Sequence, residues 1–441
     1  MIKKTFIIAF LLLAFVKVTA QEQAQDSTST YKKRVLESTE VDLLTSYYSQ
    51  DGDNAAVSGG IGTEKLTDFT PTIVVAIPLN DDDVLTIDAG VSAYTSASSS
   101  NIDPFDGSGP ADPFQASSGA SSSDLWANAS GTYSHSSDDR NTIWSGKVSL
   151  SSEFDYFSFG FGGSYTRLFN EKNTELSVNA NVYLDTWKLL YPIELRPFVD
   201  GGNGINSRLF SQYNITGNAN YAPSFTEING KSRNSYSVGF NFSQILSRRM
   251  QGSLAVDLVQ QNGLLSTPFQ RVYFSDVADS FIENFQLADD IERMPDTRFK
   301  VALGGRLNYY LNETFALRSY YRYYFDDWGI SSHTASLEIP IKITDKFTVY
   351  PSYRYYSQTA ADYFAPYEQH LSTDEFYTSD YDLSNFTANQ YGFGVTYTDI
   401  FTKFHILNYG LKSINLKFNH YERNSPFNAN IIAGGLKFIM D

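Results

Sequence analysis

The stretch LSVNANVYL, residues 176–184, carries an apolar side chain at every second position. Serine, asparagine and tyrosine fill the positions between them. Because successive side chains of a β-strand point to opposite faces, this period of two predicts a strand with one apolar and one polar face. The same alternation recurs at 73–79, 85–93, 299–309 and 335–343. We therefore expect an all-β chain.

The connections between the alternating segments fall into two kinds. Short polar turns lie at 80–83, 136–141, 170–173, 247–251, 312–314 and 344–346. Longer links run through 51–69, 95–122, 188–231, 262–297 and 358–384, and three further links, near 153, 328 and 425, are short. All the polar turns then fall on one side of the sheet and the long links on the other. Tight periplasmic turns, long extracellular loops and an even strand number are typical of outer-membrane barrels.

The pattern predicts a transmembrane antiparallel β-barrel of about 16 strands, with short periplasmic turns and long extracellular loops. Closure is required because an open edge would leave backbone groups unpaired in hydrocarbon. The strands are expected to begin near residues 41, 71, 84, 124, 142, 156, 174, 234, 252, 298, 315, 330, 347, 385, 411 and 429. The expected location is the outer membrane of a Gram-negative bacterium, with membrane lipid around the apolar face and the barrel-assembly machinery as the inserting partner. The alternation in NANIIAGGLKFIMD, 428–441, resembles an insertion signal, although it ends in Asp441 and not in an aromatic residue.

The N-terminal residues predict export. MIKKTFIIAFLLLAFVKVTA has two lysines near its start, then a short apolar run and small residues before position 21, which is the order of a secretory signal peptide. The expected organisation is therefore a signal peptide at 1–20, a flexible periplasmic leader at 21–36 and the barrel at 37–441. The chain has no cysteine, so packing and hydrogen bonds must hold it without disulfides. A formal net charge of −16 argues against nucleic acid as a partner.

Two stretches place arginine among tyrosines, YYRYYFDDWG at 320–329 and SYRYYSQT at 352–359. On alternating strands the arginines share the lumen face, while half of the tyrosines face lipid near the extracellular ends, where an aromatic girdle belongs. A turn at 327–329 would bring Glu338 close to Arg318 and Thr334 close to Arg322. The expected lumen-facing charged ladder is Arg318, Arg322, Glu338 and Arg354. It serves either as a structural network that stiffens the barrel or as an anion-selective or substrate-contacting patch.

The sequence shows no strong catalytic or metal motif. None of the five histidines lies in HExxH or in a pair with metal-ligand spacing, and no serine lies in a GxSxG elbow. We expect no enzyme, no catalytic residue, no cofactor and no designed metal site. Asp326, Asp327 and His333 are expected to form an extracellular rim cluster, and the alternative is a hydrolase that uses a rim Asp–His pair.

Two loop segments have alternative interpretations. The glycine-rich stretch SGGIGTEKLTD, 58–68, lacks the GK[ST] of a phosphate loop and is expected to shape the first extracellular loop or to let it fold into the lumen. The Ser/Ala/Gly-rich run 95–123 is expected to be a solvated loop. The alternative for this run is weak calcium binding by Asp103, Asp106 and Asp112.

Several stretches resemble domain-of-unknown-function family 3570, outer-membrane β-barrel proteins of Bacteroidetes and proteobacteria. They are AAVSGGIGTEKLTD (55–68), YTSASS (94–99), GLLSTPFQRVYF (263–274), YRYYFDDWGISSHTASLEIP (321–340), YRYYSQTAADYF (353–364) and TSDYDLSNF (378–386). The resemblance implies an outer-membrane barrel. It also implies gene neighbours that encode a small lipoprotein, a thioredoxin-like protein and a flavin transferase, and hence a surface redox or metal-handling system. It carries no catalytic residue over to this chain.

The expected function is therefore that of a conduit or docking sleeve for a surface redox- or metal-related system, with a small lipoprotein as partner. The first alternative is a general diffusion pore. The second is an outer-membrane hydrolase with a rim Asp/His site.

Overall fold

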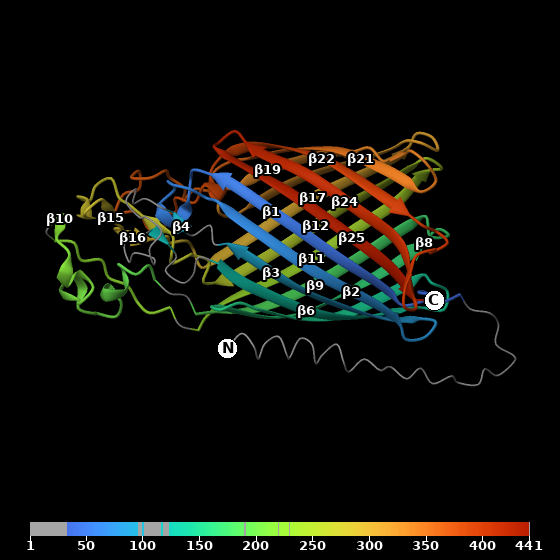
Figure 1. Ribbon diagram of the computed structural model, residues 1–441, viewed down its shortest axis with the longest axis horizontal. Helices are drawn as coiled ribbons and strands as arrows, with labels where there is room; N and C mark the ends of the chain where they lie inside the picture. The colour runs from blue at the N-terminus through green and yellow to red at the C-terminus, as the bar shows by residue number, and fades with distance from the viewer. Residues whose placement is uncertain are drawn as a thin grey trace. The chain divides into compact units, whose positions relative to one another are not determined.

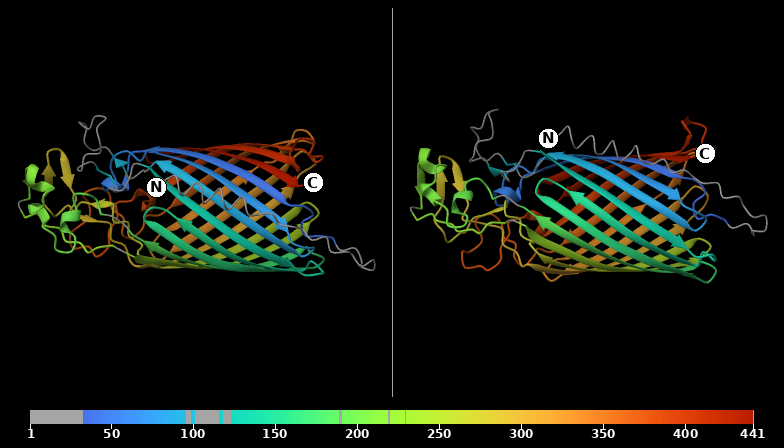
Figure 2. Two further views of the ribbon diagram at one scale, coloured as in Figure 1. Left: turned by 60° about the horizontal axis from the view of Figure 1, so that its bottom comes forward. Right: turned by 90° about the horizontal axis from the view of Figure 1, so that it is seen from below.

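The alternating segments form one large antiparallel sheet that closes on itself (Figures 1 and 2). The computed structural model describes residues 33–95, 99–100, 116–117, 123–188, 191–218, 220–228 and 230–440. The chain divides into two units, Met1–Arg34 and Val35–Asp441, and the barrel with its loops belongs to the second. The expected signal peptide at 1–20, residues 21–32 of the expected leader, and the three aspartates of the calcium hypothesis lie outside the described residues.

Sixteen of the eighteen strands in this sheet are long, since two, β20 (Ile341–Lys342) and β23 (His405–Ile406), have only two residues each. The long strands are β1 (Glu40–Gly52), β2 (Leu66–Pro78), β3 (Asp83–Thr95), β6 (Ser123–Ser136), β7 (Thr142–Ser152), β8 (Tyr156–Phe169), β9 (Thr174–Trp187), β11 (Lys231–Ser247), β12 (Met250–Gly263), β17 (Thr297–Tyr310), β18 (Ala316–Asp326), β19 (Ser331–Glu338), β21 (Phe347–Gln358), β22 (Phe386–Thr398), β24 (Tyr409–Arg423) and β25 (Phe427–Met440). The predicted barrel and its strand number are confirmed. The largest error in a predicted start is at β2, which begins at Leu66 instead of 71 because Leu66 to Thr70 already pair with β1.

The barrel closes between its first and last long strands. β25 runs antiparallel to β1 from Glu40 opposite Ile439 to Gly52 opposite Phe427. The strand β19 continues into β20 in an unchanged register, and Pro340, which has no N–H to donate, interrupts the ladder between them. All backbone edges of the long strands are therefore paired around the wall, as hydrocarbon requires.

The two faces of the wall differ in polarity as the alternation predicts. Large apolar side chains are exposed on the outer face, for example Val148 (57%), Leu254 (64%) and Phe393 (51%). Their neighbours along each strand face the lumen and are mostly hydroxyl, amide or charged side chains. An apolar exterior on a closed barrel places this chain in the outer membrane of a Gram-negative bacterium, surrounded by lipid. Among the described residues, no helix has the length and apolar character needed to cross a bilayer.

The long loops gather at one end of the barrel and the short turns at the other (Figure 1). We call the described parts of the loops 53–65, 188–230, 264–296 and 359–385 the cap. The cap contains the short strands β10 (Ile215–Gly217), β13 (Arg271–Val272), β14 (Ser280–Ile282), β15 (Phe285–Leu287) and β16 (Asp290–Ile291). It also contains the 3₁₀ turns η1 (Ala56–Ser58), η2 (Arg196–Phe198), η3 (Gly204–Asn206), η4 (Phe210–Gln212) and η5 (Tyr381–Leu383). The remaining short strands, β4 (Ser99–Ser100) and β5 (Ala116–Ser117), pair with each other in the loop 96–122.

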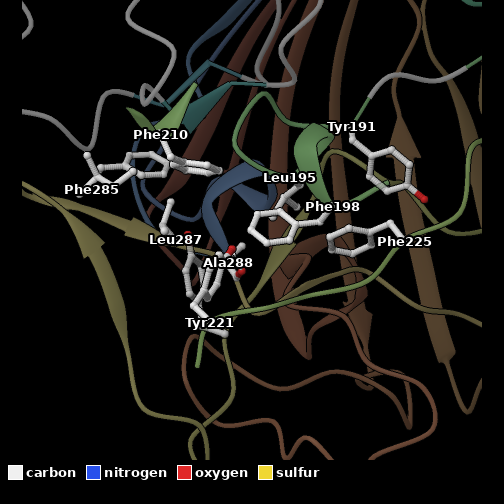
Figure 3. Packing of buried hydrophobic residues seen from close by; sticks show 11 residues of the cluster. Tyr191, Leu195, Phe198, Phe210, Tyr221, Phe225, Phe285, Leu287 and Ala288 are labelled. Carbon is white, nitrogen blue, oxygen red and sulfur yellow. Dashed lines mark hydrogen bonds between the residues drawn. The ribbon is translucent and has the colours of Figure 1, made fainter. Parts of the chain in front are cut away.

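The cap has a hydrophobic core of its own (Figure 3). Its aromatic members come from two loops that are far apart in sequence: the loop 188–230 contributes Phe198 and Tyr221, and the loop 264–296 contributes Tyr273 and Phe285. The rings of Phe198 and Tyr221 pack edge to face at a centroid distance of 5.4 Å. Burial of these rings supplies the free energy that orders segments with little regular secondary structure.

Candidate functional site

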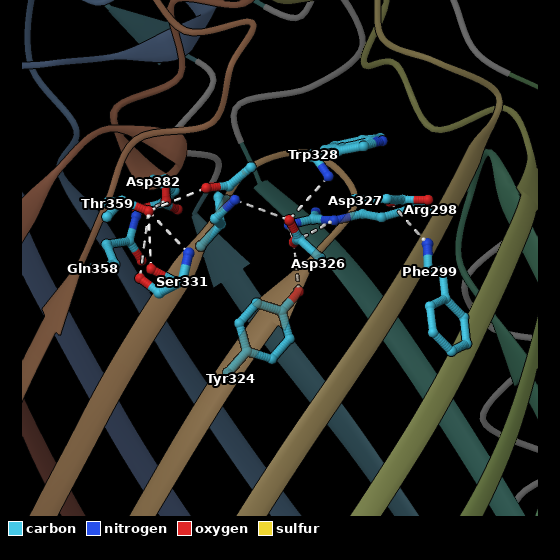
Figure 4. Close-up of polar contacts among 12 residues, drawn as sticks. Arg298, Phe299, Tyr324, Asp326, Asp327, Trp328, Ser331, Gln358, Thr359 and Asp382 are labelled. Atoms are coloured by element: carbon cyan, nitrogen blue, oxygen red, sulfur yellow. Dashed lines mark hydrogen bonds and ion pairs between the residues drawn. The ribbon is translucent and has the colours of Figure 1, made fainter.

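The turn between β18 and β19 is a closed network of polar contacts (Figure 4). Asp326 Oδ1 accepts hydrogen bonds from the backbone N–H groups of Trp328 and Ile330, both at 3.0 Å. Its Oδ2 accepts from Arg298 Nη2 at 2.5 Å and from the Tyr324 hydroxyl at 2.6 Å. The side chain of Asp326 is fully buried by these partners. The network fixes the turn and leaves this carboxylate no free oxygen for chemistry.

The structure does not bring together the rim residues singled out in the sequence. Asp327 accepts the backbone N–H of Phe299 at 2.9 Å. His333 is on the outer face of β19, where its Nδ1 lies 2.7 Å from the hydroxyl of Tyr321, whereas Asp326 points to the lumen. Because position 333 has the parity of the lipid-facing tyrosines, His333 and Asp326 face opposite sides of the wall. An Asp–His pair at this rim has no geometric support.

The predicted strand register at the arginine ladder is confirmed. Arg318 is opposite Glu338 and Arg322 is opposite Thr334 on the neighbouring strand. Arg318 Nη1 donates to Glu338 Oε1 at 3.0 Å, and Lys417, on β24, lies 3.4 Å from the other oxygen of the same carboxylate. Glu338 therefore joins two cations that come from opposite sides along the lumen wall.

Lys417 was not among the residues expected in the ladder. It reaches Glu338 because the lumen-facing positions on the strands between them are small, namely Ser352 and Gly392. Alternation alone identifies Lys417 as a lumen residue. Its partner could be found only from the order of β19, β21, β22 and β24 around the wall.

Two other arginines of the ladder differ from Arg318. Arg322 and Arg354 are exposed, and within the described part of the chain they make no ion pair and no hydrogen bond. Each is on the lumen face of its strand, between lipid-facing tyrosines at the adjacent positions. An exposed guanidinium on the inner face of a closed barrel indicates that solvent-accessible space exists beside it.

The ladder is part of a wider basic surface. Lumen-facing cations lie on four of the six successive long strands from β17 to β24, and we call them the basic arc: Arg298, Lys300, Arg306, Arg318, Arg322, Arg354, Lys417 and Arg423. The acids Asp326 and Glu338 lie on the same stretch of wall, so cations outnumber them. The rest of the lumen wall carries mainly serine, threonine and asparagine, with acids that include Asp88 and Asp257. Charge is thus distributed asymmetrically across the lumen.

The cap is tied together by one buried ion pair. Arg271 Nε donates to Glu194 Oε1 at 2.6 Å, its Nη2 donates to Oε2 at 3.1 Å, and both side chains are 0% exposed. The same guanidinium donates through Nη1 to the carbonyl of Val57 at 2.8 Å. Three loops, 53–65, 188–230 and 264–296, therefore meet at Arg271.

The glycines of the first loop allow this meeting. Gly59 and Gly60 have φ values of +77° and +91°, which side-chain-bearing residues rarely adopt. A Cβ on Gly59 would lie 2.7 Å from the Tyr273 ring, and one on Gly60 would lie 2.7 Å from the carbonyl oxygen of Ser379. The glycine-rich stretch therefore shapes the first extracellular loop so that it packs beneath its neighbours, which was one of the two expectations for it.

Several carboxyl groups of the cap have raised pKa values. Burial, with a smaller contribution from the charge of Asp380, raises the pKa of Glu292 to about 8. Burial also raises the pKa of Glu64 to about 7 and that of Asp380 to about 6. In the part of the chain that the structure describes, no three His, Cys, Asp or Glu side chains are grouped so that they could hold a metal ion.

The sequence matches the family described as Protein of unknown function (DUF3570) over residues 6–437. This chain belongs to the DUF3570 family. The match covers almost the whole length and includes all sixteen long strands apart from the last residues of β25. No curated protein matches this DUF3570 chain.

Solved structures that resemble the DUF3570 barrel are remote. A bacterial polysaccharide outer membrane secretin gives a TM-score of 0.44 at 9% identity, with 91% of this chain and 98% of that chain covered. A mutant of the TodX monoaromatic hydrocarbon channel gives a TM-score of 0.40 at 10% identity, with 92% of this chain and 91% of that chain covered. A mutant ferric enterobactin receptor from Pseudomonas aeruginosa gives a TM-score of 0.42 at 10% identity, with 88% of this chain and 54% of that chain covered. Likeness at this level carries no inference about ligand or transport.

Proposed function

We propose that the barrel is a non-enzymatic conduit of the outer membrane and that the basic arc is the wall that contacts an anionic solute. The observation that carries this proposal is the pair of exposed lumen arginines, Arg322 and Arg354, which have no acidic partner among the described residues. A purely structural ladder would pair each guanidinium with a carboxylate, as Arg318 is paired with Glu338. Rings of arginine in a pore lower the electrostatic barrier to anions.

Single-channel recording with Arg322→Gln tests the proposal. The wild-type barrel, reconstituted in a planar bilayer with a KCl gradient, is expected to conduct, and removal of one lumen cation is expected to shift the reversal potential toward cation permeation. Lys65→Gln removes the same charge from the first extracellular loop, where the lysine side chain is 71% exposed, and serves as the matched control. A wild-type lumen without conductance, or equal selectivity in the wild type and Arg322→Gln, would refute the conduit.

A docking sleeve for a small lipoprotein is the second candidate. The observation that favours it is the cap, whose own hydrophobic core gives the extracellular end a fixed shape. The redox- or metal-related part of this role rests on the family resemblance. Insertion by the barrel-assembly machinery rests on the alternation of β25. A photoreactive side chain at Leu371, which is 45% exposed on the cap, tests docking. Crosslinking in native membranes is expected to capture one lipoprotein, and its absence would count against this role.

A further inference from the structure

A pocket lies in the lumen wall where β21, β22 and β24 meet the loop 359–385. Its volume is about 360 Å³, which lies in the range of small-molecule sites. Three aromatic rings, one amide, two arginines and one carboxylate line it: Tyr356, Phe386, Tyr421, Gln390, Arg354, Arg423 and Asp382, together with Ala388. Aromatic faces beside convergent polar groups suit a ligand that has both a ring and a charge.

Two of the pocket's polar side chains have unused hydrogen-bonding groups. Arg354 and Gln390 are register partners on β21 and β22, so they lie side by side on the lumen face. Within the described residues, neither side chain forms a hydrogen bond or an ion pair. A guanidinium next to an amide offers several N–H donors to one anionic group.

The second arginine is held rigidly. The guanidinium of Arg423 lies 4.3 Å from the ring centroid of Phe386 and 4.1 Å from that of Phe427, so two aromatic rings pack against it. Its Nε donates to the Tyr421 hydroxyl at 3.2 Å. These contacts restrain a guanidinium that also lines the pocket.

The cap supplies a carboxylate to this arginine. Asp382, in η5, accepts from Arg423 Nη2 at 2.7 Å, although the Asp382 side chain itself is 69% exposed. The backbone around it is anchored separately, because Gln358 Nε2 donates to the carbonyls of Asp382 and Ser384 at 2.9 Å and 2.6 Å. The carboxylate can therefore leave Arg423 by a side-chain rotation while the loop stays attached to β21.

We propose that this pocket binds an acidic saccharide, a sugar ring bearing a carboxylate, and that Asp382 occupies the anion position when the pocket is empty. The sugar carboxylate takes the place of Asp382 on Arg423 and also accepts from Arg354, while the ring lies against Tyr356 and Tyr421. The exchange of one carboxylate for another costs little, since Arg423 remains paired throughout. The site rests on the proposed function in that it would be the solute's binding point along the conduit.

Isothermal titration of the purified full-length barrel in detergent tests the site, with glucuronate as the probe and glucose as its uncharged analogue. The wild type is expected to bind glucuronate at least about tenfold more tightly than glucose, a difference of about 1.4 kcal/mol. Arg354→Gln is expected to weaken glucuronate binding by about tenfold or more, because it removes a charged donor. Asp382→Asn is expected to strengthen binding several-fold, because it removes the internal competitor for Arg423.

Controls separate this proposal from general charge effects and from the conduit. Lys147→Gln removes a lumen cation from β7, outside the pocket, and is expected to leave glucuronate affinity unchanged. Mobility of unheated samples on SDS gels shows whether each variant is folded. Absence of glucuronate binding in both the wild type and Asp382→Asn, or equal affinity in Arg354→Gln and the wild type, would overturn the site. Because titration needs no conductance, the pocket can be refuted while the selectivity measurement on Arg322→Gln succeeds, and the reverse also holds.

Discussion

At the scale of single residues, position in the alternation decides what an arginine or a histidine does. Arg322 and His333 lie on two neighbouring strands, β18 and β19, that are joined by one turn. Arg322 faces the lumen, whereas His333 faces lipid beside Tyr321. Parity could be read from the sequence, and together with the expected turn it predicted the register of Arg318 and Arg322. It was not applied to His333, which is why the rim cluster was expected. The partners of Asp326 could not be predicted, because they depend on how the turn folds back onto Arg298.

Glu292 provides a test at this scale. Its pKa is about 8 in the closed cap because the carboxyl is buried, whereas an exposed carboxyl titrates near 4.5. Well below pH 4.5 the carboxyl is neutral in both the closed and the open cap, so it does not oppose closure of the cap. As pH rises toward 8, opening of the cap is increasingly favoured, since only the open state ionises freely, and above pH 8 the full cost applies.

Glu292→Gln should remove this pH dependence. The measurement is hydrogen exchange at the amide of Thr267, which donates to Glu292 Oε1 at 2.7 Å. At pH 8 the variant is expected to exchange more slowly than the wild type, by on the order of tenfold or more, and at pH 4, below both pKa values, the two should be nearly equal. Comparison at the same pH cancels the intrinsic exchange rate. Equal protection at pH 8 would show that the carboxyl is not buried in this way.

At the scale of elements, strands and cap were unequally predictable. A period of two in the sequence identifies each strand. Fifteen of the sixteen predicted strand starts therefore lie close to the observed ones, and the start of β2 was predicted five residues late, at 71 instead of Leu66. The cap has no period, because its backbone is mostly irregular. Its core joins rings that are separated by dozens of residues, and the ion pair at its centre joins Glu194 to Arg271, 77 positions apart. Arg271 lies within a quoted family stretch, but nothing local marks it as buried.

The cap's dependence on this ion pair can be measured. Arg271→Met leaves the carboxylate of Glu194 buried without its cation, which is expected to destabilise the cap by about 3–5 kcal/mol. Limited proteolysis should then cut within 188–230 and 53–65 much faster than in the wild type, while the barrel keeps its folded mobility on unheated gels.

The double variant Arg271→Met with Glu194→Leu is the control for this prediction. It removes both charges and is expected to recover most of the protease resistance, because no buried carboxylate remains uncompensated. If the double variant were cut as fast as the single one, the cap would depend on the hydrogen bond from Arg271 to Val57 and not on charge compensation.

At the scale of the whole molecule, closure of the wall means that each side chain faces one of two environments, lipid or the lumen. Lipid accepts apolar groups and rejects charge, while the lumen accepts both polar and charged groups. Phe240 and Asn241 are neighbours near the middle of the seventeen-residue strand β11, and only Phe240, which is 47% exposed, faces outward. One substitution at each position therefore tests the orientation of the entire sheet.

Phe240→Lys is expected to lower the free energy of unfolding in phospholipid vesicles by about 2–4 kcal/mol, because it places an ammonium near the centre of the bilayer. Asn241→Lys introduces the same charge one residue away but on the lumen face, so its effect should be much smaller. Urea titration of vesicle-inserted protein, followed by the mobility of unheated samples, measures both. Equal losses would contradict the assignment of faces, and a larger loss for Asn241→Lys would mean that the wall is turned inside out. The same alternation assigns every residue of the basic arc and of the pocket at Arg354 to the lumen face. This pair of variants therefore tests the basic arc, the pocket and the barrel together.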